Sequence, residues 1–133
     1  MSQKERDIAA LAKTIYGEAR GETREGQYAV AHSVVNRFHS NKSWLKGDTI
    51  EATCKKPQQY SCWNSNDINA SKLQNAGAEF YQIAKEVIDG HHHDNTRGAL
   101  HYHADYAKAA HQWADNKTPC ATIGAHMFYN NID

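Results

Sequence analysis

The sequence IAALAKTIYGE, residues 8–18, decides the fold of this chain. Its apolar side chains recur every three or four residues, which predicts an amphipathic helix. These apolar residues are Ile8, Leu11, Ala12 and Ile15. Ser2 and Glu5 precede them at the spacing of a capping box, in which each side chain bonds the other residue's backbone N–H. We therefore expect a first helix that begins near Ser2 and ends between Gly17 and Gly21.

Two further long helices follow in the sequence. Thr23 opens the second, and its apolar face comprises Tyr28, Ala31, Val34, Val35 and Phe38. The third covers residues 71–89, with Gly90 as its C-terminal stop. Turn-forming residues between positions 38 and 69 predict loops, interrupted by one short helix near residues 50–55.

The last quarter of the chain has the composition of strands. Residues 100–103 and 123–129 are rich in β-branched and aromatic side chains, and we expect short strands there, around Gly124. Helices followed by a late sheet predict an α+β fold that is mostly helical, with a small antiparallel sheet.

The composition predicts one domain over residues 1–133. The chain is 40% hydrophobic and 23% charged, without a visible linker or repeat. Its 15 Lys and Arg balance 15 Asp and Glu, so it lacks the basic excess of proteins that neutralise nucleic-acid phosphates. No apolar run approaches the ~18 residues that a membrane span needs. We expect a monomer that does not bind nucleic acid and does not insert into a membrane.

The first seven residues are charged and polar, without the apolar core of a signal peptide, so we expect synthesis in the cytoplasm. The three cysteines, Cys54, Cys62 and Cys120, are an odd number at no metal-site spacing. We expect them to be mostly reduced, with a bond between Cys54 and Cys62 left open.

Glu18 is the first candidate for chemistry. It follows Leu11 by seven residues and Ile15 by three, so in a continuous helix its carboxylate lies on the apolar side. Partial burial and the C-terminal end of a helix both disfavour an anion. A general acid for glycosidic cleavage requires this. From position alone, an exposed Glu18 paired with Arg20 or Lys13 is the alternative.

Several blocks of sequence, spread over nearly the whole chain, resemble those of a known protein family. They are IYGEARGE (15–22), GQYAVA (26–31), VVNR (34–37), PQQYSCW (57–63), DNTRGALHY (94–102), Trp113 and IGAHMFY (123–129). In this order they resemble the SleB-type cell-wall hydrolase family, which includes spore-cortex-lytic enzymes and some phage endolysins. Two positions depart from the family pattern: Tyr60 replaces phenylalanine, and Asn95 stands where many members have proline.

The resemblance implies a lysozyme-like fold and cleavage of peptidoglycan glycan strands, with Glu18 as the catalytic acid. It favours a lytic transglycosylase, in which the muramic acid C6 hydroxyl is the nucleophile and one carboxylate suffices. A true hydrolase usually needs two carboxylates, for which Glu22 and Asp94 are the candidates. A zinc-dependent amidase and a non-catalytic wall-binding module are further alternatives. The resemblance also suggests a phage endolysin that reaches the wall through a holin lesion.

Eight residues are candidates for substrate binding. They are Glu22, Tyr60, Ser61, Trp63, His101, Tyr102, Trp113 and His126. We expect residues 60–63 and the strand at 101–102 to meet across a cleft from Glu18, because they combine polar and aromatic side chains. For each aromatic residue, ordinary core packing is the alternative, and for His126 a structural role.

The run His91-His92-His93-Asp94, with His101, His103 and His111 nearby, raises the question of a metal site. Zinc sites use histidine and carboxylate ligands. Three consecutive histidines cannot all face one ion in a regular element, and the chain has no His-Glu-x-x-His block. We therefore predict a solvated loop, with neither a metal nor a cofactor.

Overall fold

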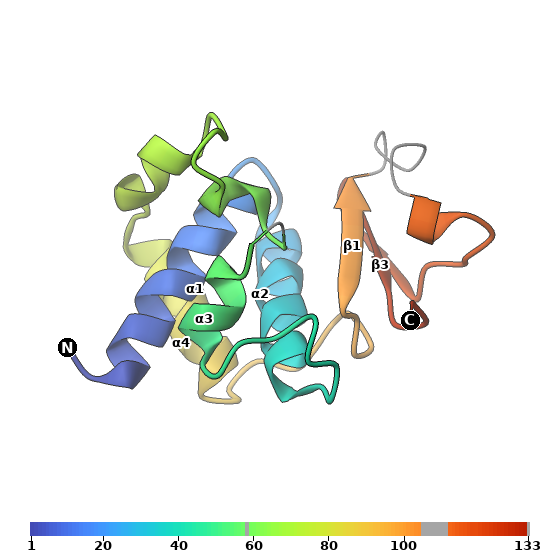
Figure 1. Cartoon of the computed structure of the whole chain (residues 1–133), viewed down its shortest axis with the longest axis horizontal. Helices are drawn as coiled ribbons and strands as arrows, with labels where there is room; N and C mark the ends of the chain where they lie inside the picture. Colours follow the sequence, from blue (N-terminus) through green and yellow to red (C-terminus); the bar gives the residue numbers. More distant parts are fainter. Residues whose placement is uncertain (58, 105–111, 133) are drawn as a thin grey trace.

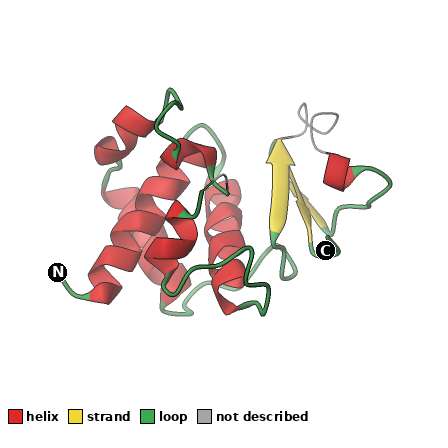
Figure 2. Ribbon diagram, viewed as in Figure 1, coloured by secondary structure: helices red, strands yellow, loops and turns green. Residues whose placement is uncertain are grey.

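The computed structural model describes residues 1–57, 59–104 and 112–132. The elements run in the order α1 (Gln3–Ala19), α2 (Arg24–His39), α3 (Ile50–Lys55), η1 (Ser61–Trp63), η2 (Ala70–Asn75), α4 (Ala78–Ile88), β1 (His101–Ala104), η4 (Gln112–Ala114), β2 (Ala121–Ile123) and β3 (His126–Tyr129). The helices α1 to α4 lie on one side of the molecule and the strands on the other (Figures 1 and 2). In the described residues no helix is both long and apolar enough to span a bilayer.

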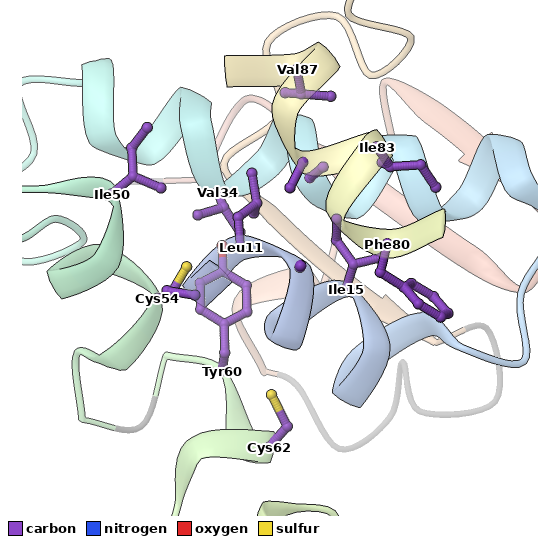
Figure 3. Packing of buried hydrophobic residues seen from close by; sticks show 14 of the residues in the cluster. Leu11, Ile15, Val34, Ile50, Cys54, Tyr60, Cys62, Phe80, Ile83 and Val87 are labelled. Atoms are coloured by element: carbon purple, nitrogen blue, oxygen red, sulfur yellow. The ribbon is translucent and has the colours of Figure 1, made fainter. Parts of the chain in front are cut away.

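Helix α1 forms as the sequence predicts. The capping box is present, because Ser2 Oγ accepts from the Glu5 N–H at 3.1 Å and Glu5 Oε1 accepts from the Ser2 N–H at 3.2 Å. Leu11 and Ile15 are fully buried in the main core, between α2, α3 and α4. Figure 3 shows this core from close by.

Helix α2 lies between the other helices and the sheet (Figure 1). Thr23 caps it through a bond from the Gly26 N–H at 3.2 Å, as predicted. Its Tyr28, Ala31 and Val34 belong to the main core. Its Ala29 and Val30 pack in a second cluster with Phe128 of β3. The helix therefore buries side chains on two faces, which joins the sheet to the helices.

The predicted third helix is wrong over residues 71–77. The chain forms the 3-10 helix η2 there, and α4 begins only at Ala78. Gly77 separates the two, with extended backbone angles (φ −85°, ψ −179°) as the N-cap of α4. This break lets Leu73 of η2 turn into the core against α1.

Within the described residues, the strands form one antiparallel sheet in the order β1-β3-β2. Tyr102 pairs with Phe128, and His126 pairs with both Ala104 and Ile123. Gly124, at φ +58°, makes the tight turn between β2 and β3. The predicted strands around Gly124 are confirmed. Because side chains alternate along a strand, Tyr102 and His101 point to opposite faces.

All three cysteines are free thiols, with Cys54 and Cys62 buried in the main core. Burial raises the pKa of Cys62, and the Glu18 carboxylate raises it further. The structure therefore contains no bond between Cys54 and Cys62.

Candidate functional site

Glu18 lies in the last turn of α1, where its half-buried carboxylate accepts hydrogen bonds from two distant segments. The Tyr102 hydroxyl of β1 donates to Oε1 at 2.7 Å. The backbone N–H of Cys62 in η1 donates to Oε2 at 3.1 Å, and Ser61 Oγ donates to the same oxygen at 3.4 Å. The predicted placement of Glu18 at the end of the first helix is therefore confirmed. Ser61, Cys62 and Tyr102 contact its carboxylate directly, whereas we expected their segments to lie across a cleft from it.

The close approach of η1 to α1 depends on Gly17. A Cβ at this position would lie 2.5 Å from Cys62 Cβ and 2.8 Å from Leu73 Cδ2. Real Cβ contacts are not that short, so Gly17 leaves the space in which Cys62 packs. The Cys62 N–H can consequently reach the carboxylate of Glu18.

Tyr102 is a half-buried donor to this site from strand β1. Burial raises the pKa of its phenol well above 10, and the Glu18 carboxylate adds to the rise. The hydroxyl thus keeps its proton and donates a hydrogen bond to Glu18. Its ring lies 5.5 Å from Phe128 and edge-on to His126 at 5.1 Å.

Tyr60 lies behind Tyr102 and is not a surface residue. It is 1% exposed, with ring centroids 6.4 Å apart in the Tyr60–Tyr102 pair. Burial raises its pKa to about 12. Tyr60 therefore supports the site from the core, and the prediction that it contacts the substrate is wrong.

Arg37, which we did not single out from the sequence, supports the same region. Its side chain is 5% exposed, and the guanidinium lies 4.9 Å from the centroid of the Tyr60 ring. Nε donates to the Leu100 carbonyl at 2.5 Å, and Nη1 donates to Gln59 Oε1 at 2.6 Å. Arg37 thereby joins the start of β1 to the segment before η1. The sequence signal for this role is that Arg37 lies among the apolar positions of the predicted second helix.

Trp63 is anchored to α1. Its indole Nε1 donates to Thr14 Oγ1 at 2.8 Å, and Thr14 is fully buried. The Lys55 ammonium lies 5.1 Å from the centroid of the indole. The half-buried ring therefore has a structural contact with α1. Truncating it would disturb the fold as well as any substrate contact.

Glu22 and His126 meet at the turn between β2 and β3. Glu22 Oε1 accepts from the Ala125 N–H at 3.1 Å and lies 3.7 Å from His126 Nδ1. Burial lowers the pKa of His126, against the opposing effect of the Glu22 carboxylate. Its Nδ1 has no hydrogen-bond partner within the described residues. His126 is therefore not the satisfied structural histidine of the alternative interpretation.

His101 and Trp113 lie on the face of the sheet that points away from Glu18. Their rings are 5.2 Å apart, and Trp113 packs edge-on against Tyr129 at 5.3 Å. Burial lowers the pKa of His101 to about 4, with the Arg37 and Lys42 cations adding to the shift. The alternation of β1 separates His101 from Tyr102. The prediction that His101 faces the Glu18 site is thus wrong, and Trp113 lies with it.

The histidine run is only partly a solvated loop. His91 and His93 are exposed, as predicted. His92 instead stacks on Tyr28 at 3.7 Å, and its Nδ1 lies 2.9 Å from Nε2 of the buried His32. In the described part of the chain no three His, Cys, Asp or Glu residues could hold one metal ion.

Asp94 and His111 were also among the candidate metal-binding residues. Asp94 accepts from Thr96, from the Gly98 N–H and from Asn36, so it organises its own loop. His111 lies outside the described residues.

Solved structures with the same fold come from spore-forming bacteria. The catalytic domain of the Bacillus cereus SleB protein is 26% identical, at a TM-score of 0.77 over 95% of this chain and 91% of that one. The catalytic domain of the germination-specific lytic transglycosylase SleB from Bacillus anthracis is 25% identical, at a TM-score of 0.76 over 98% and 97%.

Curated sequences give the same relationship. The spore cortex-lytic enzyme of Oceanobacillus iheyensis is 31% identical over 92% of this chain, and that of Bacillus subtilis is 29% identical over 92%. The chain spans 41% and 37% of the length of these two relatives. The family model described as Cell Wall Hydrolase matches residues 21–129. With this match over most of its length and the SleB catalytic-domain fold, the chain belongs to the cell wall hydrolase family.

Proposed function

We propose that this domain cleaves the glycan strand of peptidoglycan between N-acetylmuramic acid and N-acetylglucosamine, as a lytic transglycosylase with Glu18 as its single catalytic carboxylate. The observation that carries the proposal is the carboxylate itself, oriented by Tyr102, Ser61 and the Cys62 N–H. An acid held in one orientation can meet a bound glycosidic oxygen without further reorganisation.

The proposed reaction uses one carboxyl group twice, first as an acid and then as a base. Protonated Glu18 donates its proton to the glycosidic oxygen as the bond to C1 of muramic acid breaks. The resulting carboxylate then takes the proton of the C6 hydroxyl while that oxygen bonds to C1. The product is a 1,6-anhydro sugar, no water is consumed, and Glu18 regains its proton.

A hydrolase would need a second carboxylate to activate water. Glu22 accepts from the Ala125 N–H. Asp94 accepts three hydrogen bonds from Thr96 and Gly98 in its own loop and a fourth from Asn36 of α2. Both candidates are therefore occupied by structural contacts, which favours the transglycosylase. The relative from Bacillus anthracis, whose catalytic domain shares the fold, is described as a lytic transglycosylase.

The test is mass spectrometry of the muropeptides released from purified sacculi. We expect products that end in 1,6-anhydro-muramic acid. Reducible muramic acid ends would contradict the transglycosylase and indicate a muramidase. Intact glycans with freed stem peptides, produced only without a chelator, would indicate a zinc amidase.

The same assay tests the role of Glu18. General acid catalysis contributes roughly 10²–10⁴-fold to a rate, so we expect Glu18→Gln to lose activity by that order. Retained binding of this variant to sacculi separates the loss of chemistry from the loss of affinity. Full activity of Glu18→Gln would contradict the assignment.

The endolysin role is a separate part of the proposal and is supported only by the sequence resemblance to a family that includes phage endolysins. We expect that the protein, produced in the bacterial cytoplasm, lyses the cells only when a pore-forming holin is produced with it. Lysis by the protein alone would contradict this role without affecting the proposed chemistry.

A further inference from the structure

We infer that Glu22 is a positioning residue, which docks the turn between β2 and β3 onto the helices and so holds Tyr102 against Glu18. The inference rests on the proposed function of Glu18. It differs from both roles that the sequence suggested for Glu22, a substrate contact and a second catalytic carboxylate.

The first step is the fit between Glu22 and the turn. Glu22 lies between α1 and α2, and its Oε1 accepts from the Ala125 N–H at 3.1 Å. A Cβ at Gly124 would lie 2.8 Å from the same oxygen, and the left-handed backbone at this position (φ +58°) favours glycine as well. The side chain of Glu22 is 20% exposed. Glu22 therefore receives the turn at a site that is mostly shielded from solvent.

The second step leads from the turn to Tyr102. Ala125 directly precedes His126, the first residue of β3. The His126 ring meets the Tyr102 ring edge-on at 5.1 Å, and Tyr102 is also paired with Phe128 along β3. A shift of this turn would consequently move the ring of Tyr102. Its hydroxyl is 2.7 Å from Glu18 Oε1, a contact that tolerates little displacement.

A positioning role and base catalysis make different chemical demands on Glu22. A base needs the negative charge of a carboxylate, whereas docking needs only an oxygen that accepts from the Ala125 N–H. Glutamine retains an amide oxygen that can accept from the Ala125 N–H, without the negative charge. Glu22→Gln should thus preserve a docking residue and inactivate a base.

The experiment measures kcat and KM on sacculi for four single variants and one double variant. They are Glu22→Gln, Glu22→Ala, Tyr102→Phe, Glu22→Ala with Tyr102→Phe, and the control Glu25→Ala, which removes an exposed carboxylate three residues away. We expect Glu22→Gln and Glu25→Ala to stay within about twofold of the parent. Glu22→Ala should lower kcat about tenfold with KM little changed, as losing one hydrogen bond can depopulate the docked turn by that factor.

The double variant tests whether Glu22 acts through Tyr102. Residues that act through each other are not additive, so Glu22→Ala should cost little once Tyr102→Phe has already removed the hydroxyl. Circular dichroism and thermal unfolding show whether each variant is folded. A fully additive double variant would overturn the inference.

A folded but inactive Glu22→Gln would also overturn the inference, because it would make the charge essential. If Glu22→Ala does not fold, Glu22→Gln still decides between the two roles. The products identify the bond that is cleaved, and the coupling between positions 22 and 102 is measured from rates alone. The proposed function and this inference can therefore fail separately.

Discussion

At Gly17 the absence of a side chain brings two parts of the chain together. Cys62 occupies the space beside this glycine, and its N–H is bonded to Glu18. The same residue pays the usual conformational cost of glycine inside a helix, about 1 kcal/mol relative to alanine. Helix propensity alone would therefore favour alanine, and packing reverses that preference.

Gly17→Ala should lower the melting temperature and reduce activity together, because the new methyl group displaces Cys62 and its N–H from Glu18. Overpacking of this kind typically costs about 1–3 kcal/mol. Thermal unfolding and sacculus digestion measure the two effects. Gly21→Ala is the matched control, since a Cβ there would have no atom within 4 Å. Equal behaviour of the two variants would contradict this account.

Among the elements, α2 bears the contacts that fix the sheet. Ala29 and Val30 pack with Phe128, and Arg37 bonds the Leu100 carbonyl at the start of β1. Because the sheet contributes Tyr102 to the site, the position of β1 relative to α1 determines whether Glu18 keeps its donor.

We expect Arg37→Met to destabilise the protein by about 1–3 kcal/mol, because the part-buried Leu100 carbonyl and Gln59 amide oxygen would lose their charged donor. Chemical denaturation measures this change. Arg24→Met is the control, since Arg24 also lies over a tyrosine ring, Tyr28, but is exposed. A similar free energy of unfolding for both variants would contradict the role of Arg37.

The sequence predicts the elements better than it predicts their contacts. Periodicity and caps located α1, α2 and the strands, since both signals are local. Gly77 lies within the predicted helix over residues 71–89, where the structure has the two separate helices η2 and α4. The strand alternation that separates His101 from Tyr102 was readable in the sequence. The burial of Tyr60 by Arg37 was not, because it depends on packing between distant segments.

For the whole molecule, histidines whose pKa is lowered by burial make the stability depend on pH. Burial lowers the pKa values of His32 and His126, and it lowers that of His101 to about 4. Between the ordinary histidine pKa of about 6.5 and the folded value, the unfolded chain binds protons that the folded chain does not. The free energy of unfolding consequently decreases as the pH falls through that window.

We expect the melting temperature to be highest near neutral pH and to fall steadily from pH 7 to pH 4. Differential scanning calorimetry in low-enthalpy buffers at half-unit steps measures this dependence. His101→Leu should flatten the slope, because it removes the histidine whose pKa burial lowers to about 4. A melting temperature that stays constant between pH 7 and pH 4.5 would contradict the prediction.

The donors to Glu18 come from residues 61, 62 and 102, and this spread along the chain has a consequence in time. During synthesis the N-terminal residues leave the ribosome first. Helix α1 can form early, but the phenol that bonds its carboxylate emerges more than eighty residues later. A nascent or truncated chain that stops before β1 therefore carries Glu18 without its Tyr102 donor. The donors around Glu18 are complete only after β1 has been synthesised.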